Sequence, residues 1–345
     1  MFSPCLSLGK ARRVLFLGIG GGGDVVTAAA LALSFERCGG EAFIGSIVWE
    51  RYVHDPVPGP IDFSELFNVE KLGTGLALVN RDSYAVRGQK IVVPQAVKVA
   101  RVLGREVLVV DIKRGAMGMA KSLEQAMEML SLDAIVGVDV GGDVVAKGFE
   151  DDLWSPLADA IGLAALARLG DERTLLALAS PGSDGELSPH YVLRRISEIA
   201  SRRGLVGGYM LTPEDCKWLE KLLSEARSEA SALPLKAARG IWGYTRIRGG
   251  TRTVFLSPIS TVVFFLKPSI SMLDSVARFV YESRSLEEAR EILNSIGIYT
   301  ELDLEIDVAK EIAIHGLDSI DVVEIRERGR QALREKVRQV NNKLY

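Results

Sequence analysis

A run of glycines that ends in an aspartate is the feature of the sequence best suited to chemistry. It reads Gly18-Ile19-Gly20-Gly21-Gly22-Gly23-Asp24 and joins an apolar strand, Val14–Gly18, to an alanine-rich helix, Val25–Arg37. Glycine lets a ligand approach the backbone, and the first turn of a helix offers unpaired N–H groups to an anion. The segment therefore predicts a phosphate-binding loop formed by Gly18, Gly20, Gly21, Gly22 and Gly23.

The position of Asp24 conflicts with a phosphate bound directly in this loop. A carboxylate at the start of a helix stabilises the helix by ~0.3–1 kcal/mol, but it repels a bare phosphate. The conflict disappears if Asp24 holds a Mg²⁺ ion that bridges to the phosphate, or if it binds a hydroxyl or an amine. Asp24 is therefore a candidate metal ligand and catalytic residue, with simple capping of the helix as the alternative.

A second loop repeats the combination of glycine and aspartate. The predicted strand Ala134–Asp139 continues into Val140-Gly141-Gly142-Asp143. Ligands of parallel sheets bind at the carboxyl ends of the strands, so both aspartates stand where a ligand is expected. The alternative is that one aspartate caps the next helix and the other is solvated. We take Asp139 and Asp143 as candidate catalytic residues, Asp143 also as a metal ligand, and Gly141 and Gly142 as binding residues.

Two further strand ends carry similar loops. The strand Thr174–Ser180 leads into a loop in which Gly182, Ser183 and Asp184 are candidate binding residues. The strand Glu106–Ile112 leads into a glycine-rich stretch with two cations, Lys113 and Arg114, which suit a phosphate or a carboxylate. Lys113 is the candidate catalytic cation that would neutralise charge on a transferred group. Because parallel strands end at one edge of a sheet, the four loops are expected to form one site.

The elements that must position these loops alternate between strand and helix. The strands named above, with a second strand at Ala42–Trp49, lack polar alternation, which is typical of a parallel sheet covered on both faces. The helices between them are expected at Gln95–Leu103, Lys121–Leu130, Pro156–Leu169 and Pro189–Arg202. The layout predicts an α/β fold of the Rossmann-like, doubly wound type with a mainly parallel sheet.

The pattern changes after residue 205. A long helix is expected at Thr212–Ala230, a β-hairpin with a two-residue turn near 244–256, and a further strand at Ser260–Leu266. From residue 271 the chain is helical and highly charged. We therefore predict a Rossmann-like domain over 1–270 and a charged helical extension over 271–345, which could be a separate subdomain or the element through which a homo-oligomer assembles.

Composition narrows the classes of function. The chain has 345 residues, of which 48% are hydrophobic and 25% charged, and its net charge is -3. No overall positive field favours nucleic acid or an anionic membrane, and no apolar run reaches the ~18 residues of a membrane span. Three scattered cysteines and three scattered histidines point to a cytoplasmic protein without a zinc site, so that any metal would be Mg²⁺ or Mn²⁺ on carboxylates.

Taken together, these motifs resemble a known family. They are GIGGGGDVV (18–26), WERYVHDPVPGP (49–60), GVDVGGD (137–143), SPLAD (155–159) and SPGSDGELSP (180–189). In this order they resemble the prokaryotic, mainly archaeal family catalogued as domain of unknown function 1152, over about residues 12–266. The resemblance implies a Rossmann-like protein and supports treating the loops as one site. It brings no activity and no residue roles.

Three functional hypotheses follow. The first is an enzyme that binds a nucleotide such as ATP, or another phosphorylated small molecule, and carries out Mg²⁺-dependent phosphoryl or nucleotidyl transfer or ligation. The second is an NAD(P)-binding oxidoreductase, which gains from the spacing of Gly18, Gly20 and Gly23. The NAD(P) hypothesis is weakened because the chain lacks the acid expected ~20 residues after the glycines. The first acid after the second strand is Glu50. The third is a non-catalytic nucleotide sensor or assembly protein.

Overall fold

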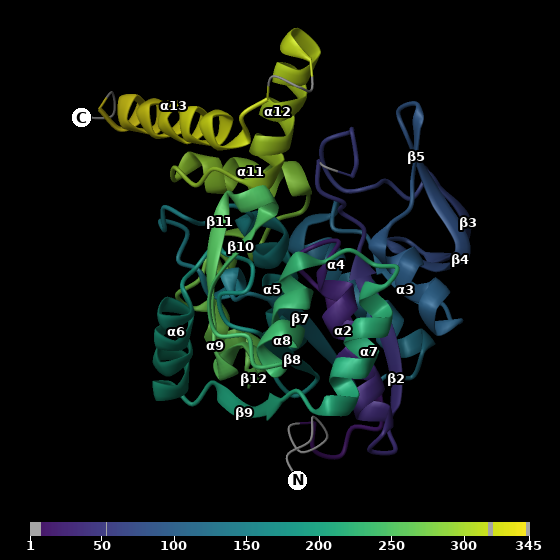
Figure 1. Cartoon of the computed structure of the whole chain (residues 1–345). Helices are drawn as coiled ribbons and strands as arrows, with labels where there is room; N and C mark the ends of the chain where they lie inside the picture. The colour runs from purple at the N-terminus through teal and green to yellow at the C-terminus, as the bar shows by residue number, and fades with distance from the viewer. Residues whose placement is uncertain (1–7, 53, 317–319, 343–345) are drawn as a thin grey trace.

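The computed structural model describes residues 8–52, 54–316 and 320–342 (Figure 1). Within these residues one large sheet runs in the order β3-β4-β6-β2-β1-β7-β8-β12-β9, and β5 pairs with β4. Its strands are β1 (Arg13–Gly18), β2 (Glu41–Ile47), β3 (Leu66–Gly73), β4 (Leu76–Arg87), β5 (Lys90–Val92), β6 (Val107–Val110), β7 (Ala134–Val140), β8 (Thr174–Ala179), β9 (Leu205–Met210) and β12 (Val262–Leu266). A separate hairpin pairs β10 (Gly243–Ile247) with β11 (Arg252–Leu256).

The centre of the sheet is parallel. β6, β2, β1, β7 and β8 pair in parallel register, whereas β3, β4, β5, β9 and β12 join through antiparallel pairs. The chain leaves β1 toward β2 and β6 on one side, and then returns to build β7 and β8 on the other. This reversal between β1 and β7 is a topological switch point, where ligands of such folds bind. The predicted Rossmann-like fold is confirmed.

Side chains of β1 alternate between two cores, as the period of a strand requires. Val14 and Phe16 pack with α2, while Leu15 and Leu17 pack with α4 and α5. The first face carries α2 (Asp24–Glu36), α3 (Gln95–Leu103), α7 (Pro213–Leu223) and α8 (Glu229–Ala238). The second carries α4 (Gly115–Met129), α5 (Pro156–Leu169), α6 (Pro189–Ser201), α9 (Pro268–Met272), α10 (Ala277–Val280) and α11 (Leu286–Ser295).

Several local predictions need correction. The long helix predicted over Thr212–Ala230 is wrong, because α7 ends at Leu223 and α8 begins only after Ser228, whose extended backbone and side-chain cap start a new helix. The hairpin turn is longer than the two residues predicted, because a 3₁₀ turn occupies Arg248–Gly250. The antiparallel strands β3, β4, β5 and β9 were not predicted, because their exposed faces interrupt the apolar pattern.

The helices after residue 270 belong partly to the body of the molecule. α11 packs against α4 and α5, and the first half of α12 (Glu301–His315) is buried beyond the carboxyl ends of the strands. α13 (Val322–Asn342) extends away from the body at the top of Figure 1. In the described ranges we find no helix with the length and apolar character that crossing a membrane demands.

Candidate functional site

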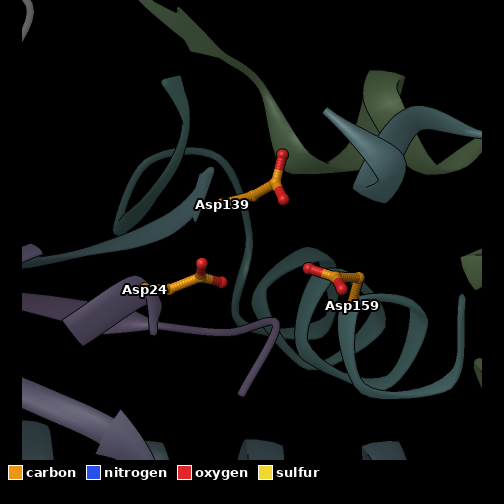
Figure 2. A group of neighbouring side chains, drawn as sticks. All are labelled: Asp24, Asp139 and Asp159. Atoms are coloured by element: carbon orange, nitrogen blue, oxygen red, sulfur yellow. The ribbon is translucent and has the colours of Figure 1, made fainter. Parts of the chain in front are cut away.

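Three aspartates from three elements meet at the switch point. Asp24 is the first residue of α2, Asp139 lies near the end of β7, and Asp159 lies in the first turn of α5. Each contributes a carboxylate oxygen, and these oxygens lie within 4.8 Å of one another. Figure 2 shows the three carboxylates pointing toward a common centre. They meet because β1 and β7 are neighbours and α5 follows β7, so all three chain positions fall at one edge of the sheet.

The glycine loop packs against the carboxylates of Asp24 and Asp159. The backbone N–H of Gly20 donates to Asp24 Oδ2 at 2.9 Å. A Cβ atom at Gly20 would lie 2.5 Å from Asp24 Oδ2 and 2.7 Å from Asp159 Oδ1, so only glycine fits there. The N-cap residue of α2 is Gly23, so no side chain caps this helix. At Gly20 the loop therefore presents carboxylate oxygens in place of an open backbone N–H.

The neighbouring glycines of this loop permit close packing against other segments. The N–H of Gly22 donates to the carbonyl of Trp49 at 3.1 Å, and Gly21 lies against the same carbonyl. Gly23 faces Ser228, and Gly18 lies so close to the start of α2 that a Cβ atom would be 2.7 Å from the nitrogen of Val25. These contacts explain the glycine content of the loop without a bound phosphate.

A second acidic group adjoins the first at the ends of β7 and β8. Asp143, Asp184 and Glu186 also bring carboxylate oxygens within 4.8 Å of one another. Glycines make this approach possible, because Gly141 has a φ of 129° and a Cβ atom there would lie 2.2 Å from Asp184 Cγ. The N–H of Gly182 donates to the carbonyl of Gly141 at 2.6 Å, which ties the two loops together.

The remaining binding candidates of these loops also lie at this edge of the sheet. Gly142 has a φ of 105° and packs against Val192. Ser183 is buried, and its N–H donates to the carbonyl of Ser180 at 3.0 Å. Ser180 itself holds a φ of 52°, a strained value for a residue other than glycine. The structure therefore brings together three of the four loops that were predicted to form one site, those after β1, β7 and β8.

Glu186 differs from the other acids because its oxygens are fully engaged. They accept hydrogen bonds from the N–H of Trp154 at 2.6 Å, from the N–H and Oγ of Ser155 at 2.9 and 2.6 Å, and from Arg252 Nη1 at 3.1 Å. Burial opposes ionisation, but Arg252 and the Ser155 contacts hold the pKa of Glu186 below its ordinary value. Glu186 is therefore an anchor for the loop that precedes α5.

Several buried oxygens of the site lack a partner among the described residues. They are Asp139 Oδ2, Asp159 Oδ1, Asp184 Oδ2 and the Oγ atoms of Ser180 and Ser183. The exposed fractions of Asp139, Asp159 and Asp184 are 1%, 2% and 5%. An unsatisfied buried polar group costs ~1–3 kcal/mol, and native proteins contain few of them. Five such atoms at one edge of the sheet make these loops the candidate site of the chain.

Burial and mutual repulsion raise the pKa values of five carboxylates at this site. Burial raises the pKa of Asp24 and of Asp184 to about 7. Burial and then the neighbouring carboxylates raise the pKa values of Asp139, Asp143 and Asp159 well above the ordinary range. The carboxylates repel one another, and all but the partly exposed Asp24 are buried, so a cation bound among them would stabilise their ionised forms.

Two acidic residues of α12, Glu301 and Glu305, complete the site and were not predicted from the sequence. Glu301 of α12 accepts hydrogen bonds from the N–H groups of Leu157 and Ala158 at 2.9 and 2.8 Å and so caps α5. One turn on, Glu305 accepts from Trp49 Nε1 at 2.9 Å. These roles depend on how α12 packs, so no local signal announces them. Asp159 could have been predicted, because it lies in the first turn of the helix expected at Pro156–Leu169 and in the motif SPLAD (155–159).

Arg51 is a cation beside these acids, in addition to Arg252. Its Nη2 donates to the carbonyl of Gly20 at 2.9 Å, and its Nη1 is buried without a partner among the described residues. Burial lowers the pKa of Arg51, but Glu301, Glu305 and further acids outweigh it and raise that pKa. Lys113 is not brought to the cluster, since its Nζ lies 3.0 Å from Asp62 Oδ2 in a half-exposed ion pair.

Comparisons with known proteins identify a family without an activity. A family model described as "Protein of unknown function (DUF1152)" matches residues 15–309. The match confirms the resemblance drawn from the sequence motifs and extends it through the first half of α12, which carries Glu301 and Glu305. No curated protein and no solved structure matches the chain.

Proposed function

The chain belongs to the family of proteins of unknown function DUF1152, and we propose that it is a Mg²⁺-dependent enzyme acting on a phosphorylated small molecule. One observation carries the proposal: Asp24, Asp139 and Asp159 converge at the switch point of the sheet, and two of them hold buried oxygens without a partner. Oxygen atoms of carboxylates are the protein ligands that Mg²⁺ prefers. The donor set therefore fits a hard divalent cation.

Each of the two acidic groups would hold one cation. Asp24, Asp139 and Asp159 would hold the first ion. Asp143 and Asp184 would hold a second, with Glu186 fixing their loop through its bonds to Ser155 and Arg252. The candidate groups in the described ranges contain carboxylates alone, without histidine or cysteine, which favours Mg²⁺ or Mn²⁺ over zinc.

The arrangement supports transfer of a phosphoryl or nucleotidyl group, or ligation, with a nucleotide such as ATP as the candidate substrate. Bound Mg²⁺ would shield the charge of a phosphate and make its phosphorus easier to attack. The chain itself would orient the substrate between the acids and Arg51, whose buried Nη1 is available to an anionic oxygen.

The NAD(P) alternative is less well supported by the contacts. A dinucleotide pyrophosphate would need the N–H of Gly20, which is already bonded to Asp24. Glu50, the acid that would bind a ribose, is buried and accepts from the N–H of Gln95 at 2.9 Å. Neither contact suits a dinucleotide, so metal-dependent group transfer is the reading we put forward.

A thermal-shift panel tests the proposal. The full chain would be melted with Mg²⁺, Mn²⁺ or neither, and with ATP, GTP, NAD⁺, coenzyme A or sugar phosphates. A ligand at 100 times its Kd stabilises a fold by about 2.7 kcal/mol. We expect stabilisation by the metal alone and a further shift with a phosphorylated ligand only when metal is present. A shift with NAD⁺ that ignores metal would contradict the proposal.

A further inference from the structure

The hairpin β10–β11 has one buried face and one exposed face. Its buried face forms a small core with α8, made of Leu233, Ile247, Val254 and Leu256. Because side chains alternate along a strand, the intervening residues lie on the opposite face. The register pairs Tyr244 with Phe255, and both residues belong to that outer face. Arg246 and its cross-strand neighbour Thr253 lie on the same face, two positions further along the hairpin.

Three aromatic rings lie together on this outer face. Trp242 and Tyr244 are 69% and 81% exposed. Both rings contact the ring of Phe255 edge to face, with centroids 5.1 Å apart in each pair. Large aromatic side chains are normally buried to a high degree, and exposed apolar residues that lie side by side mark binding surfaces. We call these three residues, together with Arg246 and Thr253, the aromatic face.

The segment that carries the aromatic face is basic, although the whole chain is not. No aspartate or glutamate occurs between Glu229 and Asp274. The same segment contains six cationic side chains, which are Lys236, Arg239, Arg246, Arg248, Arg252 and Lys267. The net charge of -3 describes the whole chain, so it does not exclude an anionic partner at this surface.

Arg246 is the cation of this segment that is available on the aromatic face. Arg252 pairs with Glu186 at 3.1 Å. Arg239 pairs with Glu220 at 2.7 Å. The side chain of Arg246 is exposed and forms no ion pair or hydrogen bond within residues 8–52, 54–316 and 320–342. The aromatic face therefore combines exposed rings with an unpaired guanidinium group, and it contains no carboxylate.

We propose that the aromatic face binds single-stranded nucleic acid. Bases would stack on Trp242 and Tyr244, and Arg246 would contact a phosphate of the strand. An acidic peptide would match the cation, but a single strand presents a flat ring and an anionic group in every unit. A duplex keeps its base faces stacked on one another, so its bases are not free to stack on these rings. This inference goes beyond the proposed function and does not depend on it.

Fluorescence anisotropy with a labelled oligothymidylate of about 16 nucleotides, on the full chain without divalent metal, tests the proposal. Trp242→Ala and Tyr244→Ala should each weaken binding about five-fold or more, because a stacking contact is lost. Arg246→Ala should weaken binding and lower the slope of log Kd against log salt concentration by about 0.7. Phe67→Ala is the matched control, because Phe67 is 42% exposed and stacks on Tyr84 on another strand surface. Thermal unfolding checks that every variant is folded.

Saturable binding that falls in the three variants of the aromatic face and is unchanged in Phe67→Ala supports the proposal. Absence of binding by the wild type, equal affinities in all the proteins, or an equal loss in Phe67→Ala would overturn it. Three further probes test the chemistry assigned to the partner. A duplex of the same length that binds as tightly would contradict stacking, thymidine monophosphate that competes as well as the strand would contradict a polymeric ligand, and poly-glutamate that competes as well would indicate an acidic protein instead.

Discussion

Asp139 and Glu186 are both buried carboxylates, yet their surroundings give them opposite consequences for stability. Asp139 faces other acids and keeps an oxygen without a partner among the described residues. Glu186 is paired with Arg252 and accepts three hydrogen bonds from Trp154 and Ser155. In the proposed function the first carboxylate binds a cation, whereas the second anchors the fold. A buried charge stabilises a protein only when its partners are built in.

Glu186→Gln should therefore destabilise the protein severely. The side chains of Glu186 and Arg252 are 3% and 11% exposed, and breaking such a buried pair costs roughly 3–5 kcal/mol. Asp139→Asn removes a charge from a repulsive group, so the metal-free variant should be at least as stable as the wild type. Urea unfolding without metal measures both variants. A Glu186→Gln variant as stable as the wild type would show that Glu186 is no anchor.

At the scale of elements, Asp215 joins α7 to the sheet and to α2. Its carboxylate accepts from the N–H of Thr212 at 2.7 Å to complete a capping box, and it also contacts Tyr209 of β9 and Arg37 at the end of α2. Burial opposes ionisation, but Thr212, Tyr209 and Arg37 lower the pKa of Asp215 below its ordinary value. The ionised form is therefore favoured by folding.

Asp215→Asn gives a pH-dependent prediction. Because the folded-state pKa is depressed, the carboxylate stabilises the fold above its unfolded pKa of about 4, and this contribution is lost as pH falls through the folded-state pKa. At pH 7 the variant should lose roughly 1.5–3 kcal/mol, and the gap from the wild type should close as pH drops below 4. Urea unfolding across pH measures the gap, with Glu214→Gln as the exposed neighbouring control. A gap that stays constant with pH would refute the role of the charge.

The elements also show what the sequence could reveal. The glycine and aspartate loops after β1, β7 and β8 were predictable, because parallel strand ends share an edge and each loop carries its own composition signal. Lys113 has the same signal, but its strand lies two places from β1, and Asp62 offers it a nearer partner. Strand order was not readable from composition. The local sequence therefore predicts the composition of each loop, whereas the strand order determines which loops lie together.

On the scale of the whole molecule, the site is completed by a distant part of the chain. Glu301 caps α5 and Glu305 binds Trp49, a separation of 256 residues in the second case. The periodicity of α12 predicts a helix, but only packing determines that these acids face the strand ends. The same holds for Arg252, which reaches Glu186 from the hairpin. Sequence reasoning therefore predicted the loops at the strand ends and missed the residues of α12 and of the hairpin that complete the site.

The tail beyond α12 is expected to support the site without taking part in it. Ile325 of α13 packs with Tyr299, Leu304 and Val308, and Arg326 donates to the carbonyl of Asp151 at 2.8 Å. The family match ends at residue 309, before α13 begins. Ending the chain after Gly316 should therefore cost at least the ~1.5–3 kcal/mol of burying one isoleucine and leave the affinity for Mn²⁺ unchanged.

Calorimetry and urea unfolding of the shortened chain check this prediction. Ile325→Ala in the full chain serves as a milder test of the same contact. Loss of metal affinity in either variant would assign α13 to the site. Light scattering on the same samples tests the predicted homo-oligomer: an assembly that survives the truncation would exclude the tail as its interface.

The central claim is that the convergent aspartates bind a divalent cation. The most direct measurement is titration of Mn²⁺ into the metal-stripped full chain by calorimetry, for the wild type, Asp139→Asn and Asp159→Asn. Asp152→Asn is the control, because Asp152 is an exposed carboxylate on the loop before α5. We predict saturable binding in the wild type and the control, and in both site variants the loss of the ion assigned to Asp24, Asp139 and Asp159, with the fold retained. Equal binding in all four proteins, or none in the wild type, would contradict the claim.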